Sequence, residues 1–126
     1  MLNLALPFAQ QMLARHGEFY PYAFSMNSEG EVRMEAAHTG SERPSSLDLL
    51  ALLYRGLAAK GKELRAAAIA SDVKLGSGED AIRLEIEHRE GAVLAVVLPY
   101  RKEHGGINYG DLAAFPGERR IWPATA

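Results

Sequence analysis

The spacing of apolar residues is the feature that most limits what this chain can fold into. The run 81–89 alternates apolar and polar side chains with a period of two, which is typical of a β-strand, and the almost wholly apolar run 92–100 is read as its neighbour. The dipeptide Glu90-Gly91 between them suits the centre of a two-residue turn. With that turn, Arg89 opposes Ala92, so the pattern predicts an antiparallel hairpin with a defined register.

Three more strands are expected earlier in the chain. Residues 19–26 and 31–36 alternate in the same way around the turn sequence Asn27-Ser28-Glu29-Gly30, which predicts a first hairpin. Residues 64–75 form a long alanine-rich run that ends at Gly76-Ser77-Gly78, and we expect a strand there.

Two segments carry the spacing of an amphipathic helix. Within residues 3–16, Leu4, Phe8 and Met12 recur at intervals of four, and Gly17 is a natural stop. A second helix is expected over residues 46–60, because Ser45 can cap its first turn. The apolar stripe of this second helix consists of Leu47, Leu49, Leu50, Leu53 and Leu57.

The order of these elements predicts the fold class. Short connections favour antiparallel neighbours, so we expect an α+β fold with a five-stranded antiparallel sheet. Both helices are predicted to pack on one face of that sheet, in the order α-β-β-α-β-β-β. The chain reads as a single domain, 1–126, with a core over 1–101 and an irregular tail rich in Gly and Pro over 102–126.

Composition excludes several classes of function. The 126 residues include 14 Lys and Arg against 16 Asp and Glu, with a net charge of −2, and no basic cluster marks a nucleic-acid surface. The absence of cysteine removes disulfides and thiolate chemistry and is compatible with a reducing compartment. No apolar stretch is long enough for a membrane helix, and the first residues lack the features of a signal peptide. We therefore expect a cytoplasmic protein that binds neither nucleic acid nor membrane.

The predicted hairpin register leaves one sheet face with an unusual composition. On the side without helices, Leu94, Val96 and Leu98 would lie beside the charged row of Arg83, Glu85 and Glu87. Such apolar side chains gain free energy when they are covered. The cover could be the strand containing Ala66, Ala68 and Ala70, the tail, or a second copy of the chain. The interface residues predicted on this basis are Leu94, Val96, Leu98 and Trp122.

Two polar clusters are candidates for binding a ligand. The first lies at the predicted junction of the first helix and strand and contains His16, Glu18, Tyr20 and Tyr22. An imidazole and a carboxylate two residues apart could share a proton. The second cluster, in the glycine-rich tail, contains His104, Asn108 and Tyr109. The ordinary interpretation of both is structural, with His16 closing the helix and the tail glycines forming turns.

None of these residues is assigned a catalytic role. The chain has no phosphate-binding loop and no nucleophile elbow, and the His/Glu pair lacks the third ligand that a catalytic metal needs. We therefore expect no cofactor and no metal site.

Part of the sequence resembles a set of small uncharacterised bacterial proteins of similar length. The resemblance lies in the stretch from His16 to Phe24, HGEFYPYAF, followed by Gly30, in Leu98-Pro99-Tyr100, and in the run from Gly117 to Ile121. It implies no catalytic residues. The order of helices and strands is also similar to that of roadblock-type domains, which are dimerising scaffold modules. Those domains usually end in a further helix, where this chain has its Gly- and Pro-rich tail.

These observations lead to two hypotheses about function. The first is a non-enzymatic protein-interaction or accessory module of the bacterial immunity type, whose partner is another protein or a second copy of the chain. The alternative is a small-molecule binding protein or hydrolase that uses His16 and Glu18.

Overall fold

The computed structural model describes residues 1–123, which form two helices and one antiparallel sheet of seven strands. The helices are α1 (Leu2–His16) and α2 (Ser46–Ala59). The strands are β1 (Tyr22–Asn27), β2 (Val32–Glu35), β3 (Leu64–Lys74), β4 (Asp80–His88), β5 (Val93–Glu103), β6 (Gly106–Tyr109) and β7 (Ala113–Pro116).

Both predicted helices and all five predicted strands are present, and their ends follow from local chemistry. The hydroxyl of Ser45 accepts the backbone N–H of Asp48 at 3.1 Å, which caps the first turn of α2. Gly17 ends α1 with a left-handed φ of 76°, and its N–H donates to the carbonyl of Leu13 at 2.8 Å.

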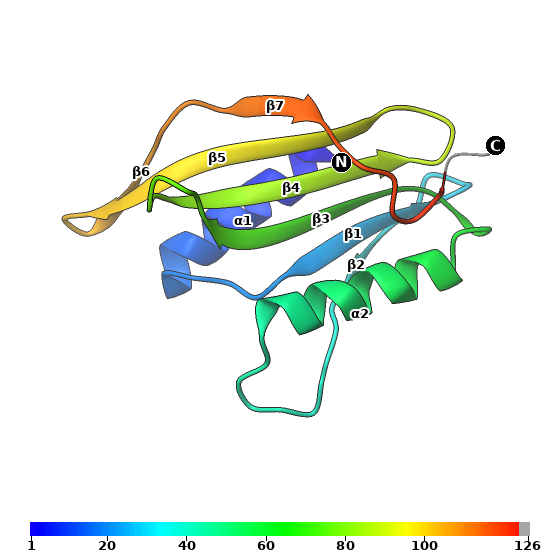
Figure 1. Cartoon of the computed structure of the whole chain (residues 1–126), viewed down its shortest axis with the longest axis horizontal. Helices are drawn as coiled ribbons and strands as arrows, with labels where there is room; N and C mark the ends of the chain where they lie inside the picture. The colour runs from blue at the N-terminus through cyan, green and yellow to red at the C-terminus, as the bar shows by residue number, and fades with distance from the viewer. Residues whose placement is uncertain (124–126) are drawn as a thin grey trace.

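The prediction of a five-stranded sheet is wrong, because the tail adds two strands. The sheet order is β2-β1-β3-β4-β5-β6, and β7 pairs with the other half of the same edge of β5 (Figure 1). His104 and Gly105, with φ of 33° and 79°, make the tight turn that returns the chain as β6. β5 has 11 residues, enough for two four-residue strands to pair along it.

The helices lie on opposite faces of the sheet, which corrects the expectation that both would share one face. One core cluster joins α1 to Tyr22, Ala68 and Leu84, and we call this side the α1 face. A second cluster joins α2 to Ala23 and Ile69 on the α2 face. In Figure 1, α1 runs behind the sheet and α2 in front of it. The central strand β3 is buried on both faces over 66–70, so each face needs a cover.

The predicted register of the β4–β5 hairpin is wrong by one residue. Leu84 pairs with Val96 rather than with Val97, because three residues, Arg89-Glu90-Gly91, form the loop. Arg89 leaves the hairpin to pair with β3, where its N–H donates to the carbonyl of Arg65 at 2.8 Å. The extra loop residue moves every side chain of one strand to the other face relative to the predicted pairing.

This shift changes the position of the predicted interface residues. Leu94, Val96 and Leu98 lie on the α1 face, opposite Ile86, Leu84 and Ile82. Val96 and Leu98 are buried in the core cluster under α1, and Leu94 packs against it. Val96 and Leu98 therefore offer almost no surface to a partner, and Leu94 is half-buried.

The tail covers the charged residues of β4 on the α2 face. Ile121 is buried in the cluster under α2, and half-buried Trp122 packs against that cluster. The indole N–H of Trp122 donates to the carbonyl of Gly61 at 2.9 Å. The last three residues of the predicted tail, 124–126, lie outside the described residues. Within residues 1–123 no helix has the length and hydropathy to cross a bilayer.

Candidate functional site

The first predicted cluster lies where α1 ends and the chain turns toward β1. His16 is the last residue of α1, and Glu18 and Tyr20 follow in the connection to β1. All three side chains are exposed, and together they line a hollow of about 460 Å³. Phe19 and Met12 provide its apolar wall, so the hollow combines an imidazole, a carboxylate and aromatic surface.

Tyr22 does not share this hollow. Its ring is buried in the core and meets Phe8 edge-on at 4.9 Å between ring centres. Its hydroxyl donates to the carbonyl of Ala5 at 2.8 Å. Burial raises the pKa of Tyr22, so the phenol stays neutral at physiological pH. Tyr22 therefore ties α1 to the sheet.

Asp72 is a member of the hollow that the sequence analysis missed. It lies in β3 and accepts the hydroxyl of Tyr100 at 2.6 Å. Burial raises the pKa of Asp72, and the hydrogen bond from Tyr100 opposes that rise. The sequence did contain a signal for Asp72. It is a carboxyl group inside an alanine-rich strand, on the same face as its apolar neighbours.

The second predicted cluster lies on the other side of the α1 terminus. His104 and Tyr109 line a hollow of about 770 Å³ with Gly17 and Lys102. Asn108 instead bonds within its own hairpin, where its amide donates to the carboxylate of Glu103 at 2.7 Å.

The two clusters lie at the same end of the sheet but open into separate hollows. Tyr100 is the link between them, because it pairs with Tyr109 across β5–β6 and donates to Asp72. Burial, and then the hydrogen bond to Asp72, raises the pKa of Tyr100. Within residues 1–123 no group of three His, Asp or Glu side chains is arranged to hold a metal ion.

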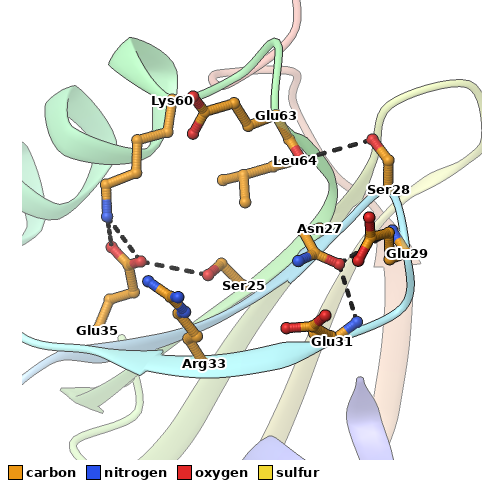
Figure 2. Close-up of a pocket in the computed structure, with 10 residues that line it drawn as sticks. All are labelled: Ser25, Asn27, Ser28, Glu29, Glu31, Arg33, Glu35, Lys60, Glu63 and Leu64. Atoms are coloured by element: carbon orange, nitrogen blue, oxygen red, sulfur yellow. Dashed lines mark hydrogen bonds and ion pairs between the residues drawn. The ribbon is translucent and has the colours of Figure 1, made fainter.

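A third, polar pocket lies at the other end of the β1–β2 hairpin (Figure 2). The ammonium of Lys60 contacts both carboxylate oxygens of Glu35, at 2.8 and 2.9 Å, and the hydroxyl of Ser25 bonds the same carboxylate at 3.3 Å. The side chain of Asn27 accepts the N–H groups of Glu29 and Glu31 and so shapes the turn. The Glu35–Lys60 pair joins the hairpin to α2, and the pocket also contains the charged side chains of Glu29, Glu31, Arg33 and Glu63.

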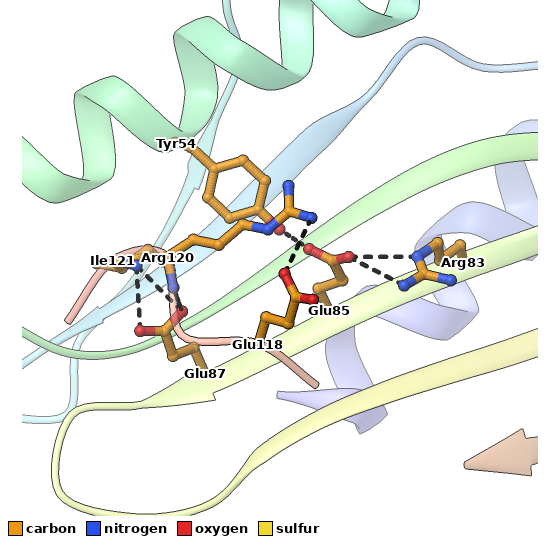
Figure 3. A network of polar contacts seen from close by, with 7 residues as sticks. All are labelled: Tyr54, Arg83, Glu85, Glu87, Glu118, Arg120 and Ile121. Carbon is orange, nitrogen blue, oxygen red and sulfur yellow. Dashed lines mark hydrogen bonds and ion pairs between the residues drawn. The ribbon is translucent and has the colours of Figure 1, made fainter. Parts of the chain in front are cut away.

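A polar network joins α2, β4 and the tail (Figure 3). Glu85 bonds the guanidinium of Arg83 at 3.2 Å and also accepts the hydroxyl of Tyr54 from α2. Burial raises the pKa of Glu85, and the positive charge of Arg120 opposes that rise. Arg120 lies over the ring of Tyr54 at 5.1 Å, which adds a cation–π contact to the tail. The polar groups of this network bond one another, and they hold the tail against α2 and β4.

An apolar groove lies between α1 and the edge strand β2. It measures about 580 Å³, and its lining includes Phe8 and Met12 from α1 and Met34 from β2. Tyr20 and residues of the connection over 36–44 also line the groove. Tyr20 and Met34 both line this groove and are 55% and 48% exposed, an unusual degree for large apolar side chains.

Comparison with known proteins does not place this geometry in a family. No family model matches the chain, and no curated protein or solved structure matches it. The features that remain to indicate a function are the exposed groove with the neighbouring strand edge, and the hollow that contains Asp72.

Proposed function

We propose that the chain is a non-enzymatic protein-interaction module that binds its partner along the apolar groove and the adjoining edge of β2. The observation that carries this proposal is the exposure of Met34, Val32 and Tyr20 beside a strand that pairs on one side only. Burying the exposed part of these side chains against a partner is favourable by roughly 25 cal/mol per Å² of apolar surface. The free strand edge adds backbone hydrogen bonds that a partner strand can use.

Other features of the chain agree with a protein partner. The net charge of −2 disfavours nucleic acid. The groove is lined mainly by carbon surface, whereas the Figure 2 pocket is lined mainly by polar side chains. A cytoplasmic setting stays part of the proposal, because the chain has no cysteine.

Affinity capture with matched baits tests this proposal. The baits are the wild-type chain, Met34→Lys in the groove, and Leu112→Lys at the far edge of the sheet, where Leu112 is 49% exposed. A partner that rebinds as a purified protein to the wild type and to Leu112→Lys, but not to Met34→Lys, supports the proposal. A partner that binds all three baits equally contradicts it.

The hollow that contains Asp72 supports a second candidate, a small-molecule binding site. Asp72 faces the same hollow as His16 and Glu18 while Tyr100 fixes its orientation. Thermal shifts with a panel of small amines test this candidate. A stabilisation seen with the wild type and lost in both Asp72→Asn and His16→Ala supports it, and equal shifts in all three proteins exclude it.

A further inference from the structure

The free edge of β2 has a definite pattern of unpaired backbone groups. Within residues 1–123 β2 pairs only with β1, and the N–H of Asn27 donates to the carbonyl of Glu31 at 2.9 Å. Pairing groups alternate along an antiparallel ladder, so Arg33 and Glu35 also direct their backbone groups toward β1. The N–H and C=O groups of Val32 and Met34 therefore point outward, where another strand can bind them.

The side chains of this edge alternate as well. Val32 and Met34 lie on the α1 face and are 38% and 48% exposed. Arg33 and Glu35 lie on the opposite face. Glu35 bonds Lys60 in its own chain, whereas no ion pair of the Arg33 guanidinium is found within residues 1–123.

We infer that a second copy of the chain binds this edge, with the two β2 strands antiparallel about a two-fold axis at Met34. This inference rests on the proposed function and names the partner. Each Met34 opposes the partner's Met34, and Val32 opposes the partner's Ala36, so the outward backbone groups face each other. Each Arg33 opposes the partner's Glu35, which creates two pairs of opposite charge.

Charge selects this register over its neighbours. An axis at Arg33 would set the two Arg33 guanidinium groups directly opposite each other, and an axis at Glu35 would do the same for two carboxylates. Like charges directly opposite on paired strands are destabilising. The Arg33–Glu35 pairs of the Met34 register also occupy the positions without backbone hydrogen bonds, where side chains approach most closely.

The far edge of the sheet lacks these properties. It consists of two separate four-residue strands, β6 and β7, and Pro116 in β7 has no N–H to donate. Neither strand contains a charged residue that could set a register. β2 is therefore the edge suited to self-association.

Cysteine placement provides a direct test, because the chain has no cysteine of its own. Met34→Cys would set two thiols across the axis with Cα atoms about 5.5 Å apart, within the range of a disulfide. Val32→Cys, the matched control, would hold its thiols about 14 Å apart, too far to bridge. Under mild oxidation we expect a covalent dimer of Met34→Cys and none of Val32→Cys.

Charge reversal gives an independent readout by sedimentation of the purified chain. The wild type should reach twice the 13.7 kDa monomer mass as its concentration rises. Arg33→Glu and Glu35→Arg should each raise the dissociation constant roughly tenfold or more. An equimolar mixture of the two variants should restore the dimer, because each carboxylate at position 33 or 35 of one variant then faces a guanidinium of the other. Trp122 fluorescence checks the folding of Glu35→Arg, which also loses the contact with Lys60.

A wild type that stays monomeric at every concentration overturns this inference and leaves the proposed function to the capture experiment. A dimer that tolerates both reversals, or that cross-links through Val32→Cys, also overturns it. If Glu35→Arg does not fold, Met34→Pro tests whether the dimer forms through β2. Proline removes a donor that points outward, so it should abolish the dimer while the β1–β2 pairing survives.

Discussion

The side-chain carboxylate of Glu87 accepts the backbone N–H of Ile121 with both oxygen atoms, each at 3.1 Å. The same carboxylate accepts the N–H groups of Arg120 at 2.9 Å and Trp122 at 2.7 Å. Glu87 is only 3% exposed, so these three donors supply the hydrogen bonds that a buried carboxylate needs. One side chain of β4 thus holds the tail against the α2 face.

Glu87→Ala should release this segment and destabilise the fold. The change leaves three backbone donors without their acceptor, and we expect a loss of about 2–4 kcal/mol in the free energy of unfolding. Trp122 is the single tryptophan, so its emission should shift to longer wavelength in the native state of the variant. Urea titration followed by fluorescence measures both effects. The exposed Glu90→Ala serves as control and should stay within about 0.5 kcal/mol of the wild type; equal effects of the two changes would contradict this role of Glu87.

The two ends of the α2 leucine stripe should respond differently to truncation. Leu57 is fully buried, so Leu57→Ala should cost about 2–5 kcal/mol by loss of burial and creation of a cavity. Leu47 is 79% exposed, so Leu47→Ala should change the free energy of unfolding by no more than about 0.5 kcal/mol. Denaturant unfolding of both variants checks the orientation of α2, and a large loss in Leu47→Ala would show that the helix is rotated.

Asp72 should give the stability a specific dependence on pH. Burial raises the pKa of this carboxyl in the folded state. The contribution of the Asp72 carboxyl to the free energy of unfolding is therefore fully present below its pKa in the unfolded chain, about 3.9. This contribution is lost as the pH rises through its pKa in the folded protein. The free energy of unfolding of the wild type minus that of Asp72→Asn should decrease with rising pH across this interval. A difference that increases with pH would mean that the hydrogen bond from Tyr100 outweighs burial.

The hydroxyl of Tyr22 should matter for stability alone. Tyr22→Phe removes a buried hydrogen bond to Ala5 and should cost about 1 kcal/mol. Tyr20→Phe is the matched change on a side chain that is 55% exposed, and it should leave the midpoint of thermal unfolding unchanged. If the two variants melt together, Tyr22 does not tie α1 to the sheet.

Local pattern predicted most of the fold correctly. The four-residue spacing of Leu4, Phe8 and Met12 identified α1, and the Ser45 cap located the start of α2. The number of loop residues between β4 and β5 was wrong, because Arg89 finds its backbone partner in β3, which is remote in sequence. β6 and β7 were not predicted, because they form by pairing with the long edge of β5 and local sequence does not reveal that pairing.

The candidate site was predicted only in part. His16, Glu18 and Tyr20 share a hollow as neighbours in sequence, but Asp72 joins them only through the path of β3. Tyr22 alternates with Tyr20 along the chain, yet its side chain enters the core because Tyr22 pairs with Ala70 of β3 and lies under α1. The charged row of β4 was expected on a sheet face without helices, and the tail instead buries Glu87 on the α2 face. Each miss comes from a contact between segments that no local pattern encodes.

Amide hydrogen exchange of β2, resolved by residue, tests the proposed use of this edge most directly. The N–H of Arg33 points toward β1 and should exchange slowly at every protein concentration. The N–H of Met34 points outward, so it should exchange rapidly in dilute protein and slow markedly as the concentration rises. Rapid exchange of Met34 in a sample whose measured mass is that of a dimer would contradict the account.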